Sequence, residues 1–371
     1  MSTLRTIIVT PNRDAWSETF IRAHIERLPG EHIVLTDGFL PKRFEGGEEV
    51  MYTGRLSRLL RSIRLRTGST WHKEHVRTLT TLVRTIDPQV VLAEYGPTGS
   101  AMLPVCRATR MPLVVHFHGV DAFSTKLLRE QGNYAELVQQ AAAIVVVSRE
   151  MEAQLLKLGA PREKLHYNCY GIDVERFTVG SPATSPKRFV AIGRFVEKKA
   201  PLLTLKSFHK AWLEDPGMQL AMIGEGPLKA ECEAFVKSNG LAAAVSFAGV
   251  VAHEEVAALL RGARAFVQHS VVSGDNDHEG TPLAVLEAMA TGIPVIATRH
   301  AGIADVVGHG VHGLLCEEHD VDAMAENLLD LANNAERAGT MGAAGRANVE
   351  ANYTMRHSIE GLHRILEGVA R

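Results

Sequence analysis

The sequence predicts an α/β protein with two domains, each built on a parallel sheet. Short apolar runs rich in β-branched residues alternate with helical stretches along the chain, which is the pattern of parallel α/β folds. A polar stretch with two prolines, SPATSPK at 181–187, interrupts this alternation and is typical of a domain boundary. A chain of 371 residues is long enough for two domains that each have a core of their own.

Composition excludes several classes of protein. Hydrophobic residues make up 46% and charged residues 22% of the chain, as in soluble globular proteins and unlike disordered or fibrous ones. The four cysteines are too far apart for a C-x-x-C zinc or redox pair, so we expect buried, reduced thiols at Cys106, Cys169, Cys232 and Cys316. The first strand-like run follows the N-terminus without a signal peptide, and no apolar run reaches the ~18 residues of a membrane span. We therefore expect a cytoplasmic protein whose membrane contacts are at most peripheral.

Five apolar runs in the first half are the candidate strands of one sheet, at 6–10, 32–35, 90–93, 113–117 and 144–148. Active sites of parallel sheets collect just past the carboxyl ends of the strands. The residues there include Asn12, Tyr95, His118 and Asp121, and they form a site that lacks a glycine-rich phosphate loop. A lone histidine at a strand end is more often structural, but Gly119 lets the backbone approach a ligand beside His118.

The segment between Gly54 and Arg77 is basic and has helical periodicity. Four arginines recur at three-residue intervals from Arg55 to Arg64, and leucine and isoleucine side chains supply an apolar face. An amphipathic helix of this kind can lie on anionic lipid. An ordinary surface helix packed on its own domain is the alternative, because charged stripes are common on solvated faces.

The second half holds five further candidate strands, at 189–193, 220–223, 245–248, 265–269 and 295–298. Arg194 directly follows the first of them and Lys199 comes five positions later, so both cations can reach one diphosphate group. The glycines at 224 and 226 resemble the start of a dinucleotide-binding loop, but Lys229 stands where its third glycine would be. An NAD site of that type is therefore not expected.

The stretch from His269 to Val306 gives the strongest indication of a ligand site. We expect Thr281 to cap a helix and Pro282 to lie in its first turn, so that the exposed N–H groups attract an anion such as a diphosphate. Helical spacing turns the large apolar residues toward the core and leaves Glu287 on a separate stripe. A lone carboxylate in so apolar a segment needs a hydrogen-bond partner, which a hydroxyl-rich ligand supplies.

These residues also form a motif. Glu279 and Glu287 have the spacing E-x7-E in EGTPLAVLE, and the pattern A-x-G-x-P-V follows at 290–295. The motif resembles the signature of the large retaining GT-B glycosyltransferase family called family 4. Four more segments resemble its bacterial exopolysaccharide and colanic-acid members, namely SETF at 17–20, YGPTG at 95–99, FHGVD at 117–121 and SGDND at 273–277. The resemblance covers most of the chain and implies an α/β GT-B fold, with two Rossmann-like domains facing across a cleft.

The resemblance implies a role for each candidate residue. Arg194 and Lys199 would bind the donor's diphosphate and stabilise it as it leaves. Glu279 would hold sugar hydroxyls, Glu287 the ribose, and His118 the other side of the sugar. Further donor contacts are expected at Gly193, Gly224, Val251, Gly280, Thr281, Pro282 and Leu283, with main-chain groups near Val251 meeting the nucleobase. The acceptor side would include Asn12, Tyr95 and Asp121.

No cofactor and no metal are expected beside the nucleotide diphosphate sugar, which is a co-substrate. The triplet Asp275-Asn276-Asp277 resembles the D-x-D metal site of another glycosyltransferase fold, but it lies in a GT-B-like loop. No base for the acceptor stands out, and in the family's proposed mechanism the leaving phosphate takes the acceptor proton. Many relatives have Asn where this chain has Tyr170, so any role of that Asn cannot be transferred. A recognised ligand spacing is also lacking at His300, His309, His312 and His319.

The expected organisation is an acceptor-side domain at 1–178, a donor-binding domain at 179–352 and a C-terminal helix at 353–371 that packs back on the first domain. The implied function is transfer of a sugar, with retention, from a UDP- or GDP-sugar to a saccharide acceptor in cell-surface or exopolysaccharide biosynthesis. A polyprenyl-diphosphate-linked acceptor would explain the Arg55–Arg64 face as a contact with the inner side of the cell membrane. Nucleic acid is not an expected partner. Two other classes stay open: a nucleotide-sugar epimerase of the same architecture, and a non-catalytic nucleotide-sugar-binding subunit.

Overall fold

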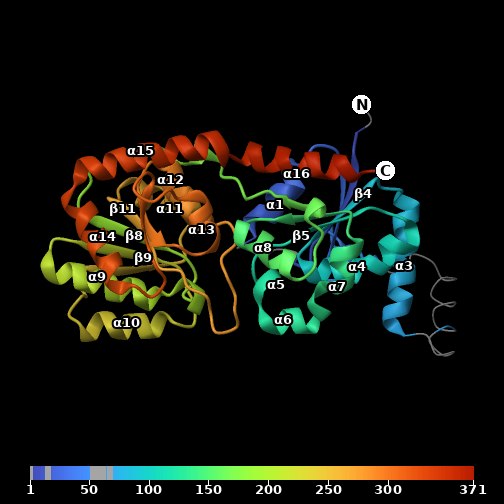
Figure 1. Ribbon diagram of the computed structural model, residues 1–371, viewed down its shortest axis with the longest axis horizontal. Coiled ribbons are helices and arrows are strands. Elements are labelled where there is room, and N and C mark those ends of the chain that lie inside the picture. Colours follow the sequence, from blue (N-terminus) through green and yellow to red (C-terminus); the bar gives the residue numbers. More distant parts are fainter. Residues whose placement is uncertain (1–2, 13–17, 51–63, 65–69) are drawn as a thin grey trace. The chain divides into compact units, whose positions relative to one another are not determined.

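The computed structural model describes residues 3–12, 18–50, 64 and 70–371. The chain divides into two compact units, each with its own sheet (Figure 1). Unit 1 comprises Met1–Val147, Met151–Asn168 and Ile359–Arg371, and unit 2 comprises Ser148–Glu150 and Cys169–Ser358. The sequence places the domain boundary slightly later, at residue 178.

The basic segment that carries Arg55, Arg58 and Arg61 lies outside the described residues. Of that face only Arg64 is described, and it is exposed and lies 3.5 Å from a carboxylate oxygen of Glu74. Within the described ranges, no helix combines the length and the apolar character needed to cross a bilayer. The four cysteines are free thiols, and all are buried except the half-buried Cys169.

Unit 1 is built on a seven-stranded sheet in the order β3-β2-β1-β4-β5-β6-β7. Neighbouring strands pair in parallel, except that β2 and β3 are antiparallel. The strands are β1 (Arg5–Val9), β2 (Glu31–Thr36), β3 (Arg43–Phe44), β4 (Val90–Glu94), β5 (Leu113–His116), β6 (Ala143–Val146) and β7 (Leu165–Tyr167). The five strands expected in this half are confirmed. The two additional strands, β3 and β7, are short and lie at the edges, where a strand needs little apolar sequence.

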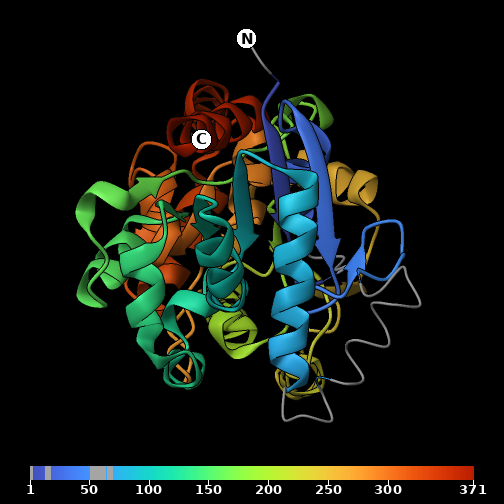
Figure 2. The same ribbon diagram turned by 90° about the vertical axis from the view of Figure 1, so that its right-hand side faces the viewer.

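Helices connect and cover the strands of unit 1 (Figure 2). They are α1 (Thr19–Arg27), α3 (Trp71–Ile86), α4 (Gly96–Thr109), α5 (Val120–Phe123), α6 (Thr125–Glu130), α7 (Ala135–Gln140) and α8 (Arg149–Lys157). Thr70 caps α3 by accepting a hydrogen bond from the N–H of Lys73 at 3.3 Å. The last helix, α16 (Met355–Val369), leads back into unit 1, where the N–H of Arg371 donates to the carbonyl of Gln89 at 3.2 Å.

Unit 2 is built on a six-stranded, fully parallel sheet in the order β10-β9-β8-β11-β12-β13. The strands are β8 (Arg188–Ile192), β9 (Gln219–Ile223), β10 (Val245–Gly249), β11 (Ala265–Gln268), β12 (Val295–Thr298) and β13 (Gly313–Cys316). The five strands expected in this half are confirmed, and β13 is an addition. Its helices are α9 (Pro201–Glu214), α10 (Lys229–Ser238), α11 (His253–Arg261), α12 (Leu283–Ala290), α13 (Ala301–Val306), α14 (Val321–Asn333) and α15 (Ala335–Asn352).

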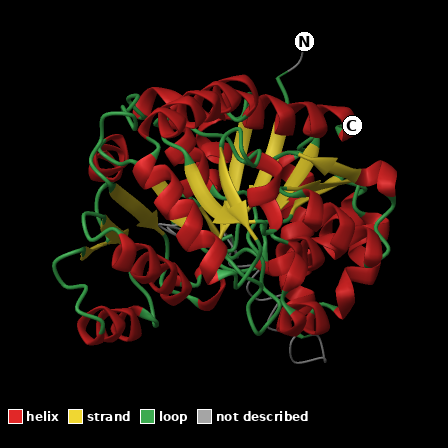
Figure 3. Ribbon diagram, turned by 60° about the vertical axis from the view of Figure 1, so that its left-hand side comes forward, coloured by secondary structure: helices red, strands yellow, loops and turns green. Residues whose placement is uncertain are grey.

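The sheet of unit 2 is buried on both faces, with helices on either side (Figure 3). Successive strand residues point to opposite faces, so Phe189 belongs to one core cluster and Val190 to the other. Val267 and Phe266 divide in the same way on β11. Because each large side chain removed from water contributes about 1.5–3 kcal/mol, burial on both faces explains why these strands read as continuous apolar runs.

Candidate functional site

The donor-side candidates of unit 2 meet at the carboxyl end of its sheet. Arg194 and Lys199 follow β8, and Glu279 lies in the loop before α12. The Nζ atom of Lys199 lies 3.0 Å from Oε1 of Glu279. Arg194 is exposed, and no acidic side chain in the described ranges pairs with it. The two stretches that the sequence assigns to one edge of the sheet are therefore in direct contact.

Three consecutive side chains hold the loop before α12. They belong to a short 3₁₀ turn, Glu197–Lys199. Oε1 of Glu197 accepts the N–H of Gly274 at 2.9 Å, and Nζ of Lys198 lies 2.9 Å from Oδ2 of Asp277. Lys199 completes the set through its ion pair with the loop. Asp277, the last residue of the D-x-D-like triplet, is thus neutralised by a lysine, which disfavours a metal at that triplet.

Glu279 is buried, with 6% of its surface exposed. Burial raises the pKa of Glu279, but the charges of Lys199 and Lys198 outweigh burial and leave the pKa below its usual value. The N–H of Glu279 donates to Nε2 of His300 at 3.1 Å. Nδ1 of the same ring lies 2.6 Å from Oε1 of Glu318. Because Nε2 accepts, the ring proton lies on Nδ1, and a carboxylate–imidazole pair fixes the position of Glu279.

Glu287 lies on the stripe of α12 that the sequence predicts. Leu283, Ala284 and Glu287 are half-buried, whereas the other side chains of this helix are buried. Burial raises the pKa of Glu287 to about 7, and Lys199 lowers it only in part. A carboxyl group that titrates near neutral pH can accept a hydrogen bond from a hydroxyl group when it is ionised.

The start of α12 differs from the prediction. Thr281 does not cap the helix, because its Oγ1 is buried and accepts the N–H of Tyr170 at 3.1 Å. Pro282 lies at the N-cap position rather than in the first turn, and no side chain caps this helix. The groups that remain for an anion are the main-chain N–H groups from Leu283 onward.

Glycines let the strand ends approach each other at this edge. Gly224 has a φ of +136°, and a Cβ atom there would lie 2.0 Å from the carbonyl oxygen of Gly193. A Cβ atom on Gly193 would lie 3.4 Å from the side chain of Lys199. Gly224 therefore needs glycine to keep the strand ends together, whereas a Cβ atom on Gly193 would make only an ordinary contact with the lysine. The other two predicted donor contacts, Gly280 and Val251, lie in the loops after β11 and β10.

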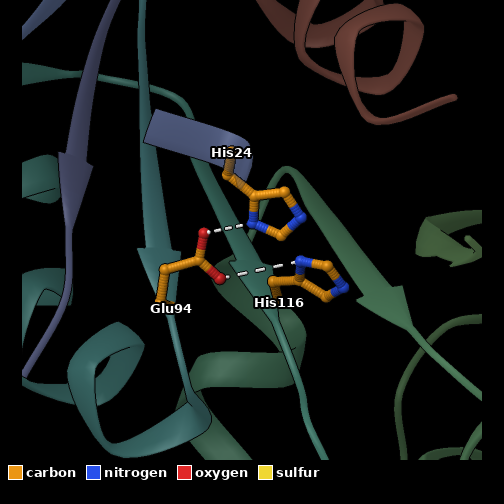
Figure 4. Close-up of side chains that lie close together, drawn as sticks. All are labelled: His24, Glu94 and His116. Atoms are coloured by element: carbon orange, nitrogen blue, oxygen red, sulfur yellow. Dashed lines mark hydrogen bonds and ion pairs between the residues drawn. The ribbon is translucent and has the colours of Figure 1, made fainter. Parts of the chain in front are cut away.

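A buried carboxylate organises the candidate residues of unit 1. Glu94 ends β4 and is fully buried. Its Oε1 lies 2.8 Å from Nδ1 of His24, and its Oε2 lies 3.6 Å from Nδ1 of His116 (Figure 4). The same Oε2 lies 2.8 Å from Nε2 of His118. Burial raises the pKa of Glu94, but the adjacent imidazoles of His24 and His118 bring it far below its usual value. Burial also holds the pKa of His116 well below its usual value, so that ring is neutral.

His24, Glu94 and His116 are also a possible metal site by donor type. Their ligand atoms lie within 4.8 Å of one another, and two imidazoles with a carboxylate are ligands that zinc accepts. However, each oxygen of Glu94 lies at hydrogen-bond distance from an imidazole nitrogen, and these contacts satisfy the carboxylate without a metal. We therefore interpret the cluster as an ion-pair network that positions His118.

The imidazole of His118 is enclosed by aromatic rings. Its side chain is 2% exposed, and the ring centroids of Phe20 and Tyr95 lie 4.7 and 4.5 Å away. Tyr95 has φ 74° and ψ 143°, a conformation that costs energy outside glycine. Its hydroxyl donates to Oε1 of Glu18 at 2.8 Å, and Nδ2 of Asn12 donates to the same atom at 2.7 Å. The structure thus brings Asn12 and Tyr95 together at Glu18, with His118 on the other side of the Tyr95 contact, against Glu94.

Asp121 is buried and holds main-chain groups of the loop after β5. It is 1% exposed, and its Oδ2 accepts the N–H of Gly96 at 2.9 Å. Its Oδ1 accepts the N–H groups of His118 and Gly119 at 2.9 and 3.0 Å. Both oxygens hold the loop after β5, and the acceptor-side contact expected at Asp121 stays a prediction.

Sequence reasoning assigned no role to three residues that shape this part of unit 1: Glu94, which it placed at a strand end, Glu18, which lies in the SETF segment, and His24, which it did not single out. Glu94 has a usable signal, because it is the last residue of an apolar strand at the carboxyl edge of the sheet. Glu18 and His24 come from the α1 region and make their contacts across long stretches of chain. Nothing local in the sequence indicates those partners.

Two family models match the chain. Residues 22–176 match the model described as "Glycosyltransferase Family 4", and residues 174–348 match the model described as "Glycosyl transferases group 1". The two matches adjoin, and each covers the sheet of one unit almost entirely.

Two of the curated relatives are bacterial glycosyltransferases named for polysaccharide biosynthesis. The amylovoran biosynthesis glycosyltransferase AmsK of Erwinia amylovora is 30% identical over 260 residues, which are 69% of this chain and 64% of that protein. The putative colanic acid biosynthesis glycosyltransferase WcaL of Escherichia coli (strain K12) is 31% identical over 245 residues, which are 64% of this chain and 60% of that protein. The aligned part of the chain therefore spans less than two thirds of the length of either relative.

A solved structure shares the fold. The crystal structure of Anabaena Alr3699/HepE in complex with UDP-glucose matches with a TM-score of 0.74. The match covers 98% of this chain and 100% of that chain at 16% identity, so it shows the fold alone.

Proposed function

The chain belongs to the family 4 glycosyltransferases and has their GT-B fold, and on that premise we propose that it transfers a sugar from a nucleotide diphosphate sugar to a saccharide acceptor, with retention at the anomeric carbon. The observation that supports this most strongly is the convergence of Arg194, Lys199 and Glu279 at one edge of the unit 2 sheet. Two cations and a buried carboxylate are the groups that a diphosphate joined to a polyhydroxylated ring requires.

The donor would replace the ion pair between Lys199 and Glu279. In the structure the two charges neutralise each other at 3.0 Å. A bound diphosphate would form ion pairs with Lys199 and with the exposed Arg194. The sugar hydroxyls would then donate hydrogen bonds to Glu279. The main-chain N–H groups at the start of α12 add positive potential near the phosphates. Glu287 would accept a hydrogen bond from the ribose.

The chemistry would consist of one bond exchange at the anomeric carbon. The bond from that carbon to the diphosphate oxygen breaks, and a bond to the acceptor hydroxyl oxygen forms on the same face of the sugar. Negative charge develops on the leaving diphosphate, where Arg194 and Lys199 stabilise it. The acceptor proton passes to the leaving phosphate oxygen, since Glu279 is engaged with Lys199 or sugar hydroxyls. These two cations would make a metal cofactor unnecessary.

The acceptor would be a saccharide of cell-surface or exopolysaccharide assembly. The names of the relatives AmsK and WcaL refer to amylovoran and colanic acid biosynthesis, which are polysaccharide pathways. We propose a UDP- or GDP-sugar donor and a polyprenyl-diphosphate-linked acceptor at the inner face of the cell membrane, with any membrane contact peripheral. His118 would contact the donor sugar, and Asn12 and Tyr95 would lie on the acceptor side.

The proposal is tested by incubating the full-length chain with a panel of UDP- and GDP-sugars in EDTA, without acceptor, and measuring release of the nucleoside diphosphate. We expect slow release from one donor, and a loss of at least 100-fold in Arg194→Ala, as for removal of a charge-stabilising donor group. Arg337→Ala is the matched control, because Arg337 is an exposed arginine of unit 2 paired with Asp330. Binding of a nucleotide sugar with formation of an epimer, or without any turnover when acceptor lipid is supplied, would contradict the proposal.

A further inference from the structure

A second carboxylate, that of Glu318, is connected to the loop that carries Glu279. Glu318 lies in the turn that follows β13, and its side chain is 25% exposed. Its Oε2 accepts the main-chain N–H of Val272 at 2.9 Å, and its Oε1 lies 2.6 Å from Nδ1 of His300. The two oxygens of one side chain therefore contact two separate segments, the loop after β11 and the residue that precedes α13.

His300 links Glu318 to the main chain of Glu279. Its side chain is 1% exposed, and its Nε2 accepts the N–H of Glu279 at 3.1 Å. A ring nitrogen that accepts a hydrogen bond carries no proton, so the proton of this imidazole lies on Nδ1, where it faces the carboxylate. Glu318 is thus the group that decides which nitrogen of His300 can accept.

The next residue, His319, connects the same turn to the start of that loop. It has a left-handed backbone conformation with φ +64°, which is uncommon outside glycine, and its N–H donates to Nε2 of His269 at 3.0 Å. Burial lowers the pKa of His269 to about 4, so this ring is neutral at neutral pH and Nε2 can accept. The turn after β13 therefore contacts the loop 269–279 at its first residue, at Val272 and, through His300, at its last residue.

These contacts reach the sugar side of the donor site rather than its phosphate side. Glu279 would hold the sugar hydroxyls, whereas Arg194 and Lys199 would bind the diphosphate. The main chain of Glu279 is held by His300, and its Oε1 lies 3.0 Å from Nζ of Lys199. A change at Glu318 would therefore alter the position of the Glu279 carboxylate and leave the exposed Arg194 as it is.

We propose that Glu318 is a positioning residue for sugar recognition: it holds the ring proton of His300 on Nδ1, so that Nε2 accepts the N–H of Glu279 and keeps that carboxylate directed at the sugar hydroxyls. The inference rests on the proposed function for the role of Glu279, whereas the tautomer of His300 can be measured without any donor.

Glu318→Gln is the informative variant, because it changes the donor pattern at almost constant shape. The amide oxygen of the glutamine can still accept the N–H of Val272. Its NH₂ group then faces Nδ1 of His300 and donates to it, so the ring proton must move to Nε2. There it points at the N–H of Glu279, and one buried hydrogen bond is replaced by two opposed donors.

The test combines nitrogen-15 NMR of the histidine side chains with turnover of a nucleotide sugar, both on the full-length chain. The His300 signals, assigned by their absence in His300→Gln, should show a protonated Nδ1 in the wild type and a protonated Nε2 in Glu318→Gln. The same variant should lower kcat/KM for release of the nucleoside diphosphate by roughly 10–100-fold, as for loss of one buried hydrogen-bond partner. Its affinity for UDP and GDP should equal that of the wild type.

Replacing the ring separates the two contacts of His300. His300→Gln places an amide oxygen near the position of Nε2 and should retain the contact with Glu279, whereas His300→Asn places its amide nearer to Nδ1 and should lose that contact. Adding Glu318→Gln to His300→Gln should have little further effect, because no ring proton remains to be directed. Glu317→Gln is the matched control, since Glu317 is an exposed neighbour that pairs with Arg299.

The outcomes separate this inference from the proposed function. A wild-type His300 protonated on Nε2, or a Glu318→Gln variant that keeps the wild-type tautomer, would overturn the inference alone. Reversal of the tautomer with unchanged turnover would also overturn it, as would a loss of UDP and GDP affinity that matches the loss of turnover. A wild-type chain that binds none of the nucleotide sugars would contradict the proposed function and, with it, the sugar role of Glu318.

Discussion

Replacing Lys199 with methionine tests how strongly the donor site depends on one ion pair. The side chains of Lys199 and Glu279 are 18% and 8% exposed, and their charged atoms lie 3.0 Å apart. Removing the cation leaves a buried carboxylate without its nearest partner, and breaking such a pair costs about 3–5 kcal/mol. The charge of Lys198 also lowers the pKa of Glu279, so we expect the lower end, about 3 kcal/mol.

The measurement is equilibrium unfolding in urea, followed by a probe of unit 2. We expect Lys199→Met to lose about 3 kcal/mol at an unchanged slope. Adding Glu279→Gln to it should restore about 2 kcal/mol, because the buried charge is then gone. Neither variant should turn over a nucleotide sugar. Lys210→Met, which breaks an exposed pair with Asp322, should change stability by less than ~1 kcal/mol.

Two results would refute this reasoning. One is a Lys199→Met variant as stable as the wild type, which would mean that water or Lys198 compensates Glu279 completely. The other is a double variant whose loss of stability equals the sum of the losses in Lys199→Met and Glu279→Gln. In that case the two residues would be energetically independent despite their 3.0 Å contact.

Three further predictions follow from the same geometry. Because the pKa of Glu287 is about 7, nucleotide-sugar affinity should rise roughly tenfold as pH rises through 7, and Glu287→Gln should flatten this dependence in calorimetric titrations. Burial lowers the pKa of His269 to about 4, below the ~6.5 of the unfolded chain. The free energy of unfolding should therefore fall by up to about 3 kcal/mol as pH drops from 6.5 to 4. If a His269→Gln variant shows the same loss in urea titrations, His269 is not the group responsible. In thermal unfolding, Gly224→Ala should lower the stability of the protein by about 2–3 kcal/mol. The control Gly240→Ala should lower it by about 1 kcal/mol, because Gly240 also has a positive φ of +69° but its added Cβ meets open space.

The sequence predicts those parts of the fold that depend on local periodicity. Strands buried on both faces, such as β11 and β12, stand out because each is a continuous apolar run between turn residues. The stripe that leaves Glu287 half-buried follows from helical spacing alone. The rule that ligands gather past the carboxyl ends of parallel strands is sufficient to bring Arg194, Lys199 and Glu279 to one edge.

The parts that the sequence does not predict depend on contacts between distant residues. The hydroxyl of Thr281 is taken by the N–H of Tyr170 instead of the helix, a partner that no local pattern indicates. Asp121 looks available in the sequence, but three main-chain N–H groups occupy its carboxylate. Glu94 contacts histidines from α1 and from the end of β5 with the loop that follows it, so its role emerges only when the sheet is assembled.

The most direct test of the central claim is a time-resolved proton NMR spectrum of the sugar released from an α-linked nucleotide sugar in EDTA. A retaining, metal-independent site predicts that the first sugar to appear is the α-anomer, and that Arg194→Ala releases none above background. Initial release of the β-anomer, or release that requires added divalent metal, would contradict the account.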